Sequence, residues 1–494
     1  MNLLSDSIFR CEPKGCRTLS ELFFGLAQGD IRAFTSLRPH QRAAWHMFLV
    51  QLGTIAVENF GWPRDPKEWE TAIRSLTEFG DDPWKLVVDD RSRPAFFQPP
   101  DPGGLNWNDV PTPDALDMLI SSKNHDLKAQ VAADARSEDW VFALVTLQTM
   151  EGYGGAGNFG IARMNGGSSS RPMLAAAPVS EHGCVDLSLW WRRDVERLLD
   201  IRTKKSESVG EIGGQALLWC TPWPECQQLE IADLDPLFLE VCRRIRLFQV
   251  SGKIKAERST SKKARINAKA FKGVLGDPWA PIHRVESKAL SLGARDFDYR
   301  TIRDLLYGDW AIPLLAKQGP GEQSDKLVLV AEAISRGNSR TDGLKRRVIP
   351  LPKSGWYAED TASTADAMID EIHVIDTALR DSIAIFVARG VHGKVGKAER
   401  LAAADARRRF DQSTDRIFFQ SLWQWVEAER LGDSLPAQTA FRNQLIHFAY
   451  NELKSALYAT PISQTWAPRA RVRALKCFRN VLFKSGKLLE FKHV

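Results

Sequence analysis

One glycine-rich stretch decides between the possible folds of this chain: residues 152–172 read GYGGAGNFGIARMNGGSSSRP. Gly152, Gly154 and Gly157 satisfy the pattern G-x-G-x-x-G, which opens a dinucleotide-binding fold when a strand precedes it and a helix follows. The apolar run before it, WVFALVTLQTM, is typical of either a helix or a strand. Further glycines, three serines and Pro172 come after it and disfavour a helix. The stretch therefore predicts a loop and argues against a doubly wound dinucleotide-binding domain.

The glycine content of this loop also points to a contact surface. A run of glycines lets the backbone approach another surface closely and exposes its N–H groups. Asn158, Arg163 and Asn165 add polar donors to the same loop. Such a loop suits a DNA minor groove, where bulky side chains do not fit. A long flexible surface loop is the alternative that composition leaves open.

The positive charge of the chain is concentrated in one tract. The 494 residues carry a net charge of +6, whereas residues 243–272 contain eleven basic residues and one acidic residue, a net charge of +10. The other 464 residues are therefore net acidic, at −4. The Lys-rich sequence SGKIKAERSTSKKARINAKA, residues 251–270, predicts a mobile segment that orders on a phosphate backbone. A solvated charged face is the alternative. The residues expected to contact the DNA backbone are Lys262, Lys263, Arg265 and Lys269.

The distribution of helical patterns predicts an α+β protein. Residues 41–57 have apolar side chains at helical spacing and predict a buried helix, whereas residues 172–240 mix short apolar runs with Trp and Pro and predict strands. From Ala358 onward Pro becomes rare, and four long helical patterns predict a C-terminal four-helix bundle. These patterns span residues 361–389, 398–431, 436–458 and 467–484. We expect a mixed α/β domain over residues 1–355 and the bundle over residues 356–494.

Composition and motifs exclude several classes of protein. No run of about 18 apolar residues occurs, and the start MNLLSDSIFRCEPKG does not have the pattern of a signal peptide, so we expect a cytoplasmic protein. The seven cysteines are scattered without a C-x-x-C pair, which predicts neither a disulfide framework nor a zinc site. No G-x-S-x-G, H-E-x-x-H or G-x-x-x-x-G-K-[ST] motif occurs. A metal- or nucleotide-dependent nuclease acting through residues 121–170, with His125 in SKNHDLK, stays open as the enzymatic alternative.

The order of these features resembles the large subunit of the type I-E CRISPR Cascade complex, the CasA family. MNLLSDSIF is similar to the opening strand of that family, and GYGGAGNFGIARMNGG lies where the family carries its glycine loop. SRGNSRTDGLKRRV, residues 335–348, is similar to the wedge hairpin of the family, and a helical bundle then ends the chain. The resemblance covers essentially the whole length and keeps the order of the motifs.

The resemblance implies a site, residue by residue. In the family the glycine loop contacts the protospacer-adjacent motif from the minor groove, and a lysine enters the same groove. A hairpin loop starts strand separation, and another loop contacts the 5′ handle of the guide RNA. The corresponding residues are Gly154, Gly155, Ala156, Gly157 and Asn158 in the glycine loop, Lys288 for the groove lysine, Asn338, Ser339 and Arg340 in the wedge, and Lys123, Asn124 and His125 at the guide handle. This wedge loop lacks the glutamine that the family carries at the tip of the wedge, so Asn338 or Arg340 would take the role of that glutamine.

The resemblance further implies a non-catalytic subunit that uses no cofactor and no metal. Some family members carry a cysteine cluster where this chain has its Lys-rich tract, so no zinc is expected. The implied partners are guide RNA, double-stranded target DNA, the backbone, handle-binding and small subunits of Cascade, and a helicase–nuclease recruited on target binding. In such complexes guide pairing reads the target while protein reads the adjacent motif and begins R-loop formation. A general single-strand-binding scaffold is a further alternative.

Overall fold

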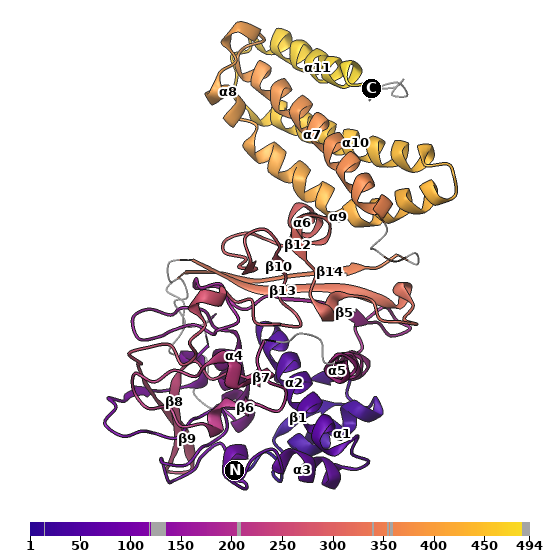
Figure 1. Cartoon of the computed structure of the whole chain (residues 1–494). Coiled ribbons are helices and arrows are strands. Elements are labelled where there is room, and N and C mark those ends of the chain that lie inside the picture. The colour runs from indigo at the N-terminus through magenta and orange to yellow at the C-terminus, as the bar shows by residue number, and fades with distance from the viewer. Residues whose placement is uncertain are drawn as a thin grey trace. The chain divides into compact units, whose positions relative to one another are not determined.

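The computed structural model describes residues 1–13, 15–117, 119, 135–204, 209–337, 340–352, 355 and 359–486. The chain divides into two units, Met1–Phe297 with Asp304–Leu351 and Asp298–Arg303 with Pro352–Val494 (Figure 1). The first unit combines helices with small sheets, and the second is helical, which confirms the predicted α+β class. None of the described helices is both long and apolar enough to cross a lipid bilayer.

The first unit is built from helices and several small sheets. Its helices are α1 (Leu19–Gln28), α2 (Arg42–Phe60), α3 (Pro66–Arg74), α4 (Ser137–Met150), α5 (Leu187–Thr203) and the second half of α6 (Tyr299–Tyr307). Two of its sheets have the orders β2-β1-β3 and β4-β9-β8, from β1 (Phe9–Glu12), β2 (Cys16–Arg17), β3 (Ala33–Phe34), β4 (Asn108–Val110), β8 (Arg244–Val250) and β9 (Lys253–Ser259). Two more have the orders β14-β13-β5 and β11-β10-β12, from β5 (Met173–Pro178), β10 (Ile282–His283), β11 (Lys288–Ala289), β12 (Trp310–Ala311), β13 (Leu327–Gly337) and β14 (Arg340–Pro350). A parallel pair joins β6 (Gln215–Leu217) to β7 (Leu234–Leu239).

Helix α2 forms the centre of the core in the first unit. Every residue from Ala43 to Val57 is buried, so the predicted buried helix is confirmed. Its aromatic side chains pack among those of other elements, with the ring of Trp45 centred 5.3 Å from Phe9 and 5.0 Å from Phe142. Burial on all sides explains why the helix is apolar around its whole circumference instead of along one stripe.

Two predictions for the middle of the chain hold only in part. Residues 172–240 contain strands β5, β6 and β7, as predicted, but they also contain helix α5, where Asp186 caps the first turn by accepting from the Leu189 N–H at 2.9 Å. The buried side chains of α5 recur at helical spacing, but the apolar period is interrupted in the sequence because Arg193, Asp194 and Arg202 occupy buried positions. Only part of residues 251–270 lacks regular structure, because β9 (Lys253–Ser259) pairs antiparallel with β8 over the seven residues of each strand, whereas residues 260–268 contain no helix or strand.

The longest strand pairing joins β13 to β14. The ladder runs from Val328 opposite Pro350 to Gly337 opposite Arg340, and β5 pairs with the other edge of β13 (Figure 1). The register shifts between Ser335 and Arg336, which marks a β-bulge near the turn of the hairpin. A bulge of this kind bends the strand and changes the direction of the residues beyond it.

The second unit contains the four long helices that the sequence predicts. They are α7 (Glu359–Val387), α9 (Ala404–Arg430), α10 (Leu435–Ala459) and α11 (Ala467–Lys484), with the short α8 (Lys397–Leu401) before α9. Helix α7 packs against α9, α10 and α11. Residues Asp298–Arg303 belong to this unit because the buried Tyr299 donates its hydroxyl to Asp411 at 2.9 Å and its ring lies 4.8 Å from that of Phe418. The Phe418 and Trp425 side chains are buried in the core of the bundle.

We predict that Gly53→Ala destabilises the first unit. A Cβ at position 53 in α2 would lie 2.7 Å from the Cζ2 atom of Trp191, whose indole donates to the Leu49 carbonyl at 3.0 Å. Overpacking of this kind costs about 1–3 kcal/mol, more than the helix propensity that alanine adds. Urea unfolding measures the free energy, with Gly393→Ala as the control because a Cβ there meets nothing within 4 Å. Equal stability of the two variants would contradict the prediction.

Candidate nucleic-acid interface

The glycine-rich stretch forms a loop whose two ends lie side by side. It leaves α4 after Met150 and returns to β5 at Met173, and an isolated bridge pairs Glu151 with Ser170 at its base. Throughout this fully described stretch no helix follows the G-x-G-x-x-G pattern. The loop therefore lacks the helix N-terminus on which a dinucleotide pyrophosphate would rest.

Residues 154–158 form a tight turn at one side of this loop. The Gly154 N–H donates to the Asn158 carbonyl, and the Asn158 N–H donates to the Gly155 carbonyl, both at 2.9 Å. Gly155 has φ of +116° and Gly157 has φ of +73°, conformations that glycine adopts at little cost. The turn therefore presents backbone and small side chains, with Gly154 and Ala156 exposed.

The turn packs directly on the basic tract. A Cβ at Gly157 would lie 2.6 Å from the Cβ of Thr260, and the Ser261 N–H donates to the Gly157 carbonyl at 3.0 Å. Arg244 in turn donates to the Ser261 hydroxyl at 3.1 Å. Two features that are separated by about a hundred residues in sequence are thus in contact, and glycine at position 157 is what allows the approach.

The loop and the tract line a common hollow of about 880 Å³, which we call the lysine-side hollow. Its glycines are Gly152, Gly160, Gly166 and Gly167, and its lysines are Lys262, Lys263, Lys269 and Lys272. All four lysines are exposed. The hollow is thus lined by glycine backbone, by larger side chains such as those of Phe159 and Met164, and by several ammonium groups. The ammonium groups are suited to the phosphate backbone of a nucleic acid.

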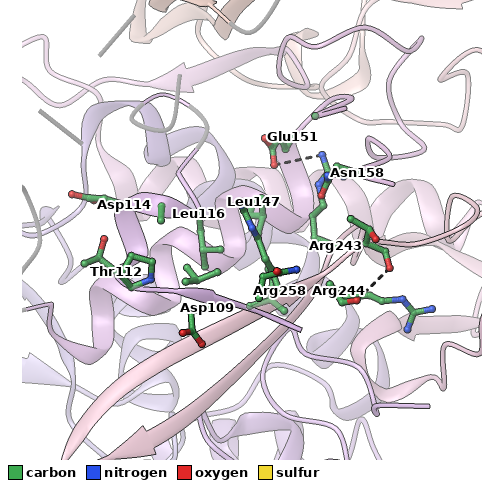
Figure 2. Close-up of a pocket in the computed structure, with 18 of the residues that line it drawn as sticks. Asp109, Thr112, Asp114, Leu116, Leu147, Glu151, Asn158, Arg243, Arg244 and Arg258 are labelled. Atoms are coloured by element: carbon green, nitrogen blue, oxygen red, sulfur yellow. Dashed lines mark hydrogen bonds and ion pairs between the residues drawn. The ribbon is translucent and has the colours of Figure 1, made fainter. Parts of the chain in front are cut away.

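A second hollow of about 890 Å³ lies against the same turn, and we call it the arginine-side hollow (Figure 2). Gly154, Asn158, Arg243, Arg258 and Arg336 are among its lining residues. Figure 2 shows Glu151 facing Arg243 with Asn158 beside them, and the Glu151 carboxylate lies 3.5 Å from the Arg243 guanidinium. Burial raises the pKa of Glu151, while Arg243 and Arg336 act to lower it.

The structure describes the whole basic tract and divides its charges into two groups. Seven side chains are exposed: Lys253, Lys255, Arg258, Lys262, Lys263, Lys269 and Lys272. Four arginines are buried: Arg243, Arg244, Arg246 and Arg265. Less than the full charge of the tract therefore faces solvent.

The prediction that Arg265 contacts the DNA backbone is wrong. Its side chain is 3% exposed and donates to the carbonyls of Leu218 and Thr221, both at 2.7 Å. Its guanidinium lies 4.8 Å from the ring of Trp223, on which Arg244 also lies. Burial, together with the charge of Arg244, lowers the pKa of Arg265 to about 9. Arg265 is a structural residue, and its alternation with exposed lysines in sequence gave no indication of this.

The expected groove lysine lies beside the lysine-side hollow. Lys288 begins β11, its side chain is partly exposed, and it forms an ion pair with Glu286. The next residue, Ala289, donates its N–H to the carbonyl of Lys272 at 3.0 Å. The tertiary structure therefore brings Lys288 close to the lysine-rich wall, although Glu286 neutralises part of its charge.

The other predicted contacts lie mostly outside the described residues. Asn338 and Ser339 of the wedge are outside them, and so are Lys123, Asn124 and His125 at the expected guide-handle loop. Arg340 begins β14 opposite Gly337, which places its backbone at the turn of the hairpin.

Comparisons with known proteins identify solved structures that share this architecture. No family model matches the chain, and no curated protein matches it. Among solved structures, CasA of Thermus thermophilus is 13% identical with a TM-score of 0.64, covering 98% of this chain and 99% of that one. Cse1 of Acidimicrobium ferrooxidans is 16% identical with a TM-score of 0.61, covering 98% of each chain. A chain of a CRISPR RNA-guided surveillance complex is 14% identical with a TM-score of 0.57, covering 98% and 99%.

The chain has the CasA fold. The resemblance that the sequence motifs carry is thereby confirmed at the level of the fold, over nearly the whole length of both chains. At these identities the comparisons assign no role to individual residues.

The CasA fold of this chain contains functional candidates that sequence reasoning missed. Lys272 lines the lysine-side hollow, and its place at the end of the basic tract could have indicated it. Glu151 and Arg336 approach within 3.3 Å from positions 185 residues apart, so no local pattern could have paired them. Glu240 lines the lysine-side hollow with an otherwise buried side chain that accepts from the Ala162 N–H at 2.7 Å, and the sequence around it is unremarkable.

We predict that Glu240 makes the stability of this unit depend on pH. Burial raises the pKa of Glu240 to about 7, against the opposing effects of the Ala162 N–H and nearby arginines. A raised carboxyl pKa favours the folded state at low pH, and this contribution is lost as the pH rises from about 4.5 through 7. Glu240→Gln should flatten the pH dependence of the unfolding free energy between pH 5 and 8, by a difference on the order of 3 kcal/mol. Urea unfolding across this range measures the slope.

The exposed Glu211 supplies the matched control. Glu211→Gln should keep the wild-type slope. A Glu240→Gln slope equal to that of the wild type would show that Glu240 stays ionised in the folded protein.

Proposed function

We propose that this chain is the non-catalytic large subunit of a type I-E CRISPR Cascade complex, and that it recognises the protospacer-adjacent motif in duplex DNA. The observation that carries the proposal is that the 154–158 turn and the basic tract are in contact, and that the loop bearing this turn lines a hollow with four exposed lysines. The CasA fold supports the same function, because one structure with this fold is a chain of an RNA-guided surveillance complex.

Recognition would use the backbone of the turn. The minor groove of B-DNA is about 6 Å wide and presents a pattern that is largely degenerate between base pairs. A turn with exposed Gly154 and Ala156 can approach such a groove, and its N–H and C=O groups can contact base edges without large side chains. This mode of recognition would tolerate several adjacent motifs.

Affinity would come from the lysines. Contacts between ammonium groups and phosphates release counterions and are independent of sequence. Lys262, Lys263 and Lys269 lie on the wall that faces the glycine loop and would hold the duplex against it. Lys288, which is adjacent to Lys272 through the β11 backbone, would enter the groove from the same side.

Strand separation would begin at the turn between β13 and β14. Opening a base-pair step costs about 1–2 kcal/mol, which pairing with the guide repays once it has started. A hairpin inserted beside the recognised motif needs to lower this cost only for the first steps. Asn338, Ser339 and Arg340 would form the inserted tip, and Lys123, Asn124 and His125 would contact the guide handle.

The remaining partners follow from the same proposal. The chain would assemble in the cytoplasm with guide RNA and with the backbone, handle-binding and small subunits of Cascade. Target binding would then recruit a helicase–nuclease that performs the cleavage.

The competing prediction, a nuclease acting through residues 121–170, is tested by incubating the isolated chain with DNA and Mg²⁺ or Mn²⁺. Cleavage in that assay would overturn the non-catalytic assignment.

We predict that Ala156→Trp weakens binding of target duplex by about tenfold or more, a change of at least about 1.4 kcal/mol. Ala156 is exposed at the tip of the turn and has no left-handed backbone conformation, so a large side chain would obstruct the groove without straining the loop. Electrophoretic mobility shift with the assembled complex measures the affinity. Leu189→Trp, on the exposed face of α5 in the same unit, should bind like the wild type. Unchanged affinity of Ala156→Trp would reject the groove contact.

The lysines of the lysine-side hollow lead to a separate prediction about how DNA affinity depends on salt concentration. Replacing Lys262, Lys263 and Lys269 together with Gln should reduce the slope of log K against log salt concentration by about 0.9 for each phosphate that these lysines neutralise. The control replaces Lys253 and Lys255, which are exposed in the same tract but do not line the hollow. The control slope should equal that of the wild type. If the triple variant also kept the wild-type slope, these lysines would form only a solvated charged face.

A further inference from the structure

Glu151 occupies the junction between the glycine loop and helix α4. It is the residue that follows the last turn of α4, and its bridge to Ser170 closes the base of the loop. Its side chain is 9% exposed, so its charge is removed from bulk solvent. A buried carboxylate requires partners, because an unpaired charge in such a site is strongly unfavourable.

Two arginines from different elements supply those partners. Arg243 comes from the start of the basic tract, and its Nη2 lies 3.5 Å from Oε2 of Glu151 while donating to the Gly152 carbonyl at 2.7 Å. Arg336 comes from β13, and its Nη1 lies 3.3 Å from Oε1 of Glu151. The Glu151 carboxylate thus contacts Arg243, which holds the glycine loop at Gly152, and also Arg336 in the β13–β14 hairpin.

The backbone joins the same two elements at the same place. The Ser170 N–H donates to the Ile334 carbonyl at 3.2 Å, and the Ile334 N–H donates to the Ser170 hydroxyl at 2.7 Å. The β-bulge between Ser335 and Arg336 follows immediately, at the point where the hairpin turns toward its tip. The base of the glycine loop therefore lies against the last regular residues of β13 before the tip.

The Arg336 side chain is constrained around this contact. Only 10% of it is exposed, and its Nε has no hydrogen-bond partner among the described residues. Among the described residues, Glu151 is the acid that pairs with the Arg336 guanidinium. A displacement of the glycine loop that moves Glu151 would therefore also move the charge that this guanidinium faces.

We propose that Glu151 is a positioning residue that couples the 154–158 turn to the β13–β14 hairpin, so that docking of a duplex on the turn sets the hairpin for strand separation. This inference rests on the proposed function. It adds a physical connection between recognition and opening, carried by the Gly152–Arg243–Glu151–Arg336 contacts. The coupling predicts that recognition and opening can be separated by changing one side chain that contacts neither strand.

The experiment measures opening separately from binding. The assembled complex with guide RNA is mixed with a duplex that carries 2-aminopurine in the first base pairs beside the motif, and the fluorescence increase gives the opening rate. Glu151→Gln should open the intact duplex about tenfold more slowly, a typical size for coupling between two sites. Its affinity for a target already unpaired at those positions should stay within about twofold of the wild type.

Three further variants complete a double-mutant cycle and add a control. Arg336→Gln should slow opening by a similar factor, and the double variant Glu151→Gln/Arg336→Gln should be no slower than either single variant, because both remove the same ion pair. Glu332→Gln removes another buried carboxylate from β13, one that pairs with Arg346 across the hairpin and does not contact the glycine loop. It should open duplex at the wild-type rate. If Glu151→Gln fails to assemble, Arg336→Gln carries the same comparison.

The outcomes distinguish this inference from the proposed function. Wild-type complex that does not discriminate duplexes with and without the adjacent motif would overturn the proposed function itself. Discrimination by the wild type together with normal opening by Glu151→Gln would overturn only the coupling. Equal slowing by Glu332→Gln, or additive effects in the double variant, would show that the loss reflects general damage to the hairpin and would also overturn the coupling.

Discussion

The guanidinium of Arg243 holds together the elements that form the candidate interface. Gln148 on α4 accepts from the backbone N–H of Arg243 at 2.8 Å and donates to its carbonyl at 2.9 Å, so the start of the basic tract is fixed to the helix. The side chain then donates to the Gly152 carbonyl and faces Glu151. Buried polar groups are costly unless they are paired. Loss of any one of these contacts would therefore leave a buried group without its partner. The orientation of the glycine loop relative to the tract follows from this arrangement.

The basic tract performs two physical tasks. Its buried arginines are structural: Arg244 and Arg265 lie on the ring of Trp223, and Arg244 also holds Ser261, which hydrogen-bonds the glycine turn. Its lysines keep their ammonium groups at the surface. Arginine suits the first task because its planar guanidinium stacks on aromatic rings and donates to several carbonyls at once, whereas lysine keeps a compact charge in solvent. The net charge of this tract is therefore larger than the charge that it exposes to solvent.

Local patterns predicted a large part of the fold. The long C-terminal helices and the buried α2 follow from hydrophobic spacing, and the absence of a helix after Gly157 follows from the glycines and Pro172. Helix α5 was mistaken for strands because charged residues at buried positions interrupt its apolar period. Residues 251–270 were expected to be mobile because their composition is polar, yet residues 253–259 form β9, which pairs with β8. Strand pairing depends on a partner in the sheet, and composition does not contain that information.

The glycine turn itself is a local property, since positive φ at Gly155 and Gly157 requires residues without a side chain and the sequence supplies them. The family resemblance and the separation of charge into a basic tract and an acidic remainder are likewise present in the order of residues. The placement of Thr260 against Gly157, the burial of Arg265 and the meeting of Glu151 with Arg336 depend on packing between segments far apart in the chain. Burial and ion pairing arise from the surroundings of a side chain in three dimensions, and those surroundings exist only once the chain has folded.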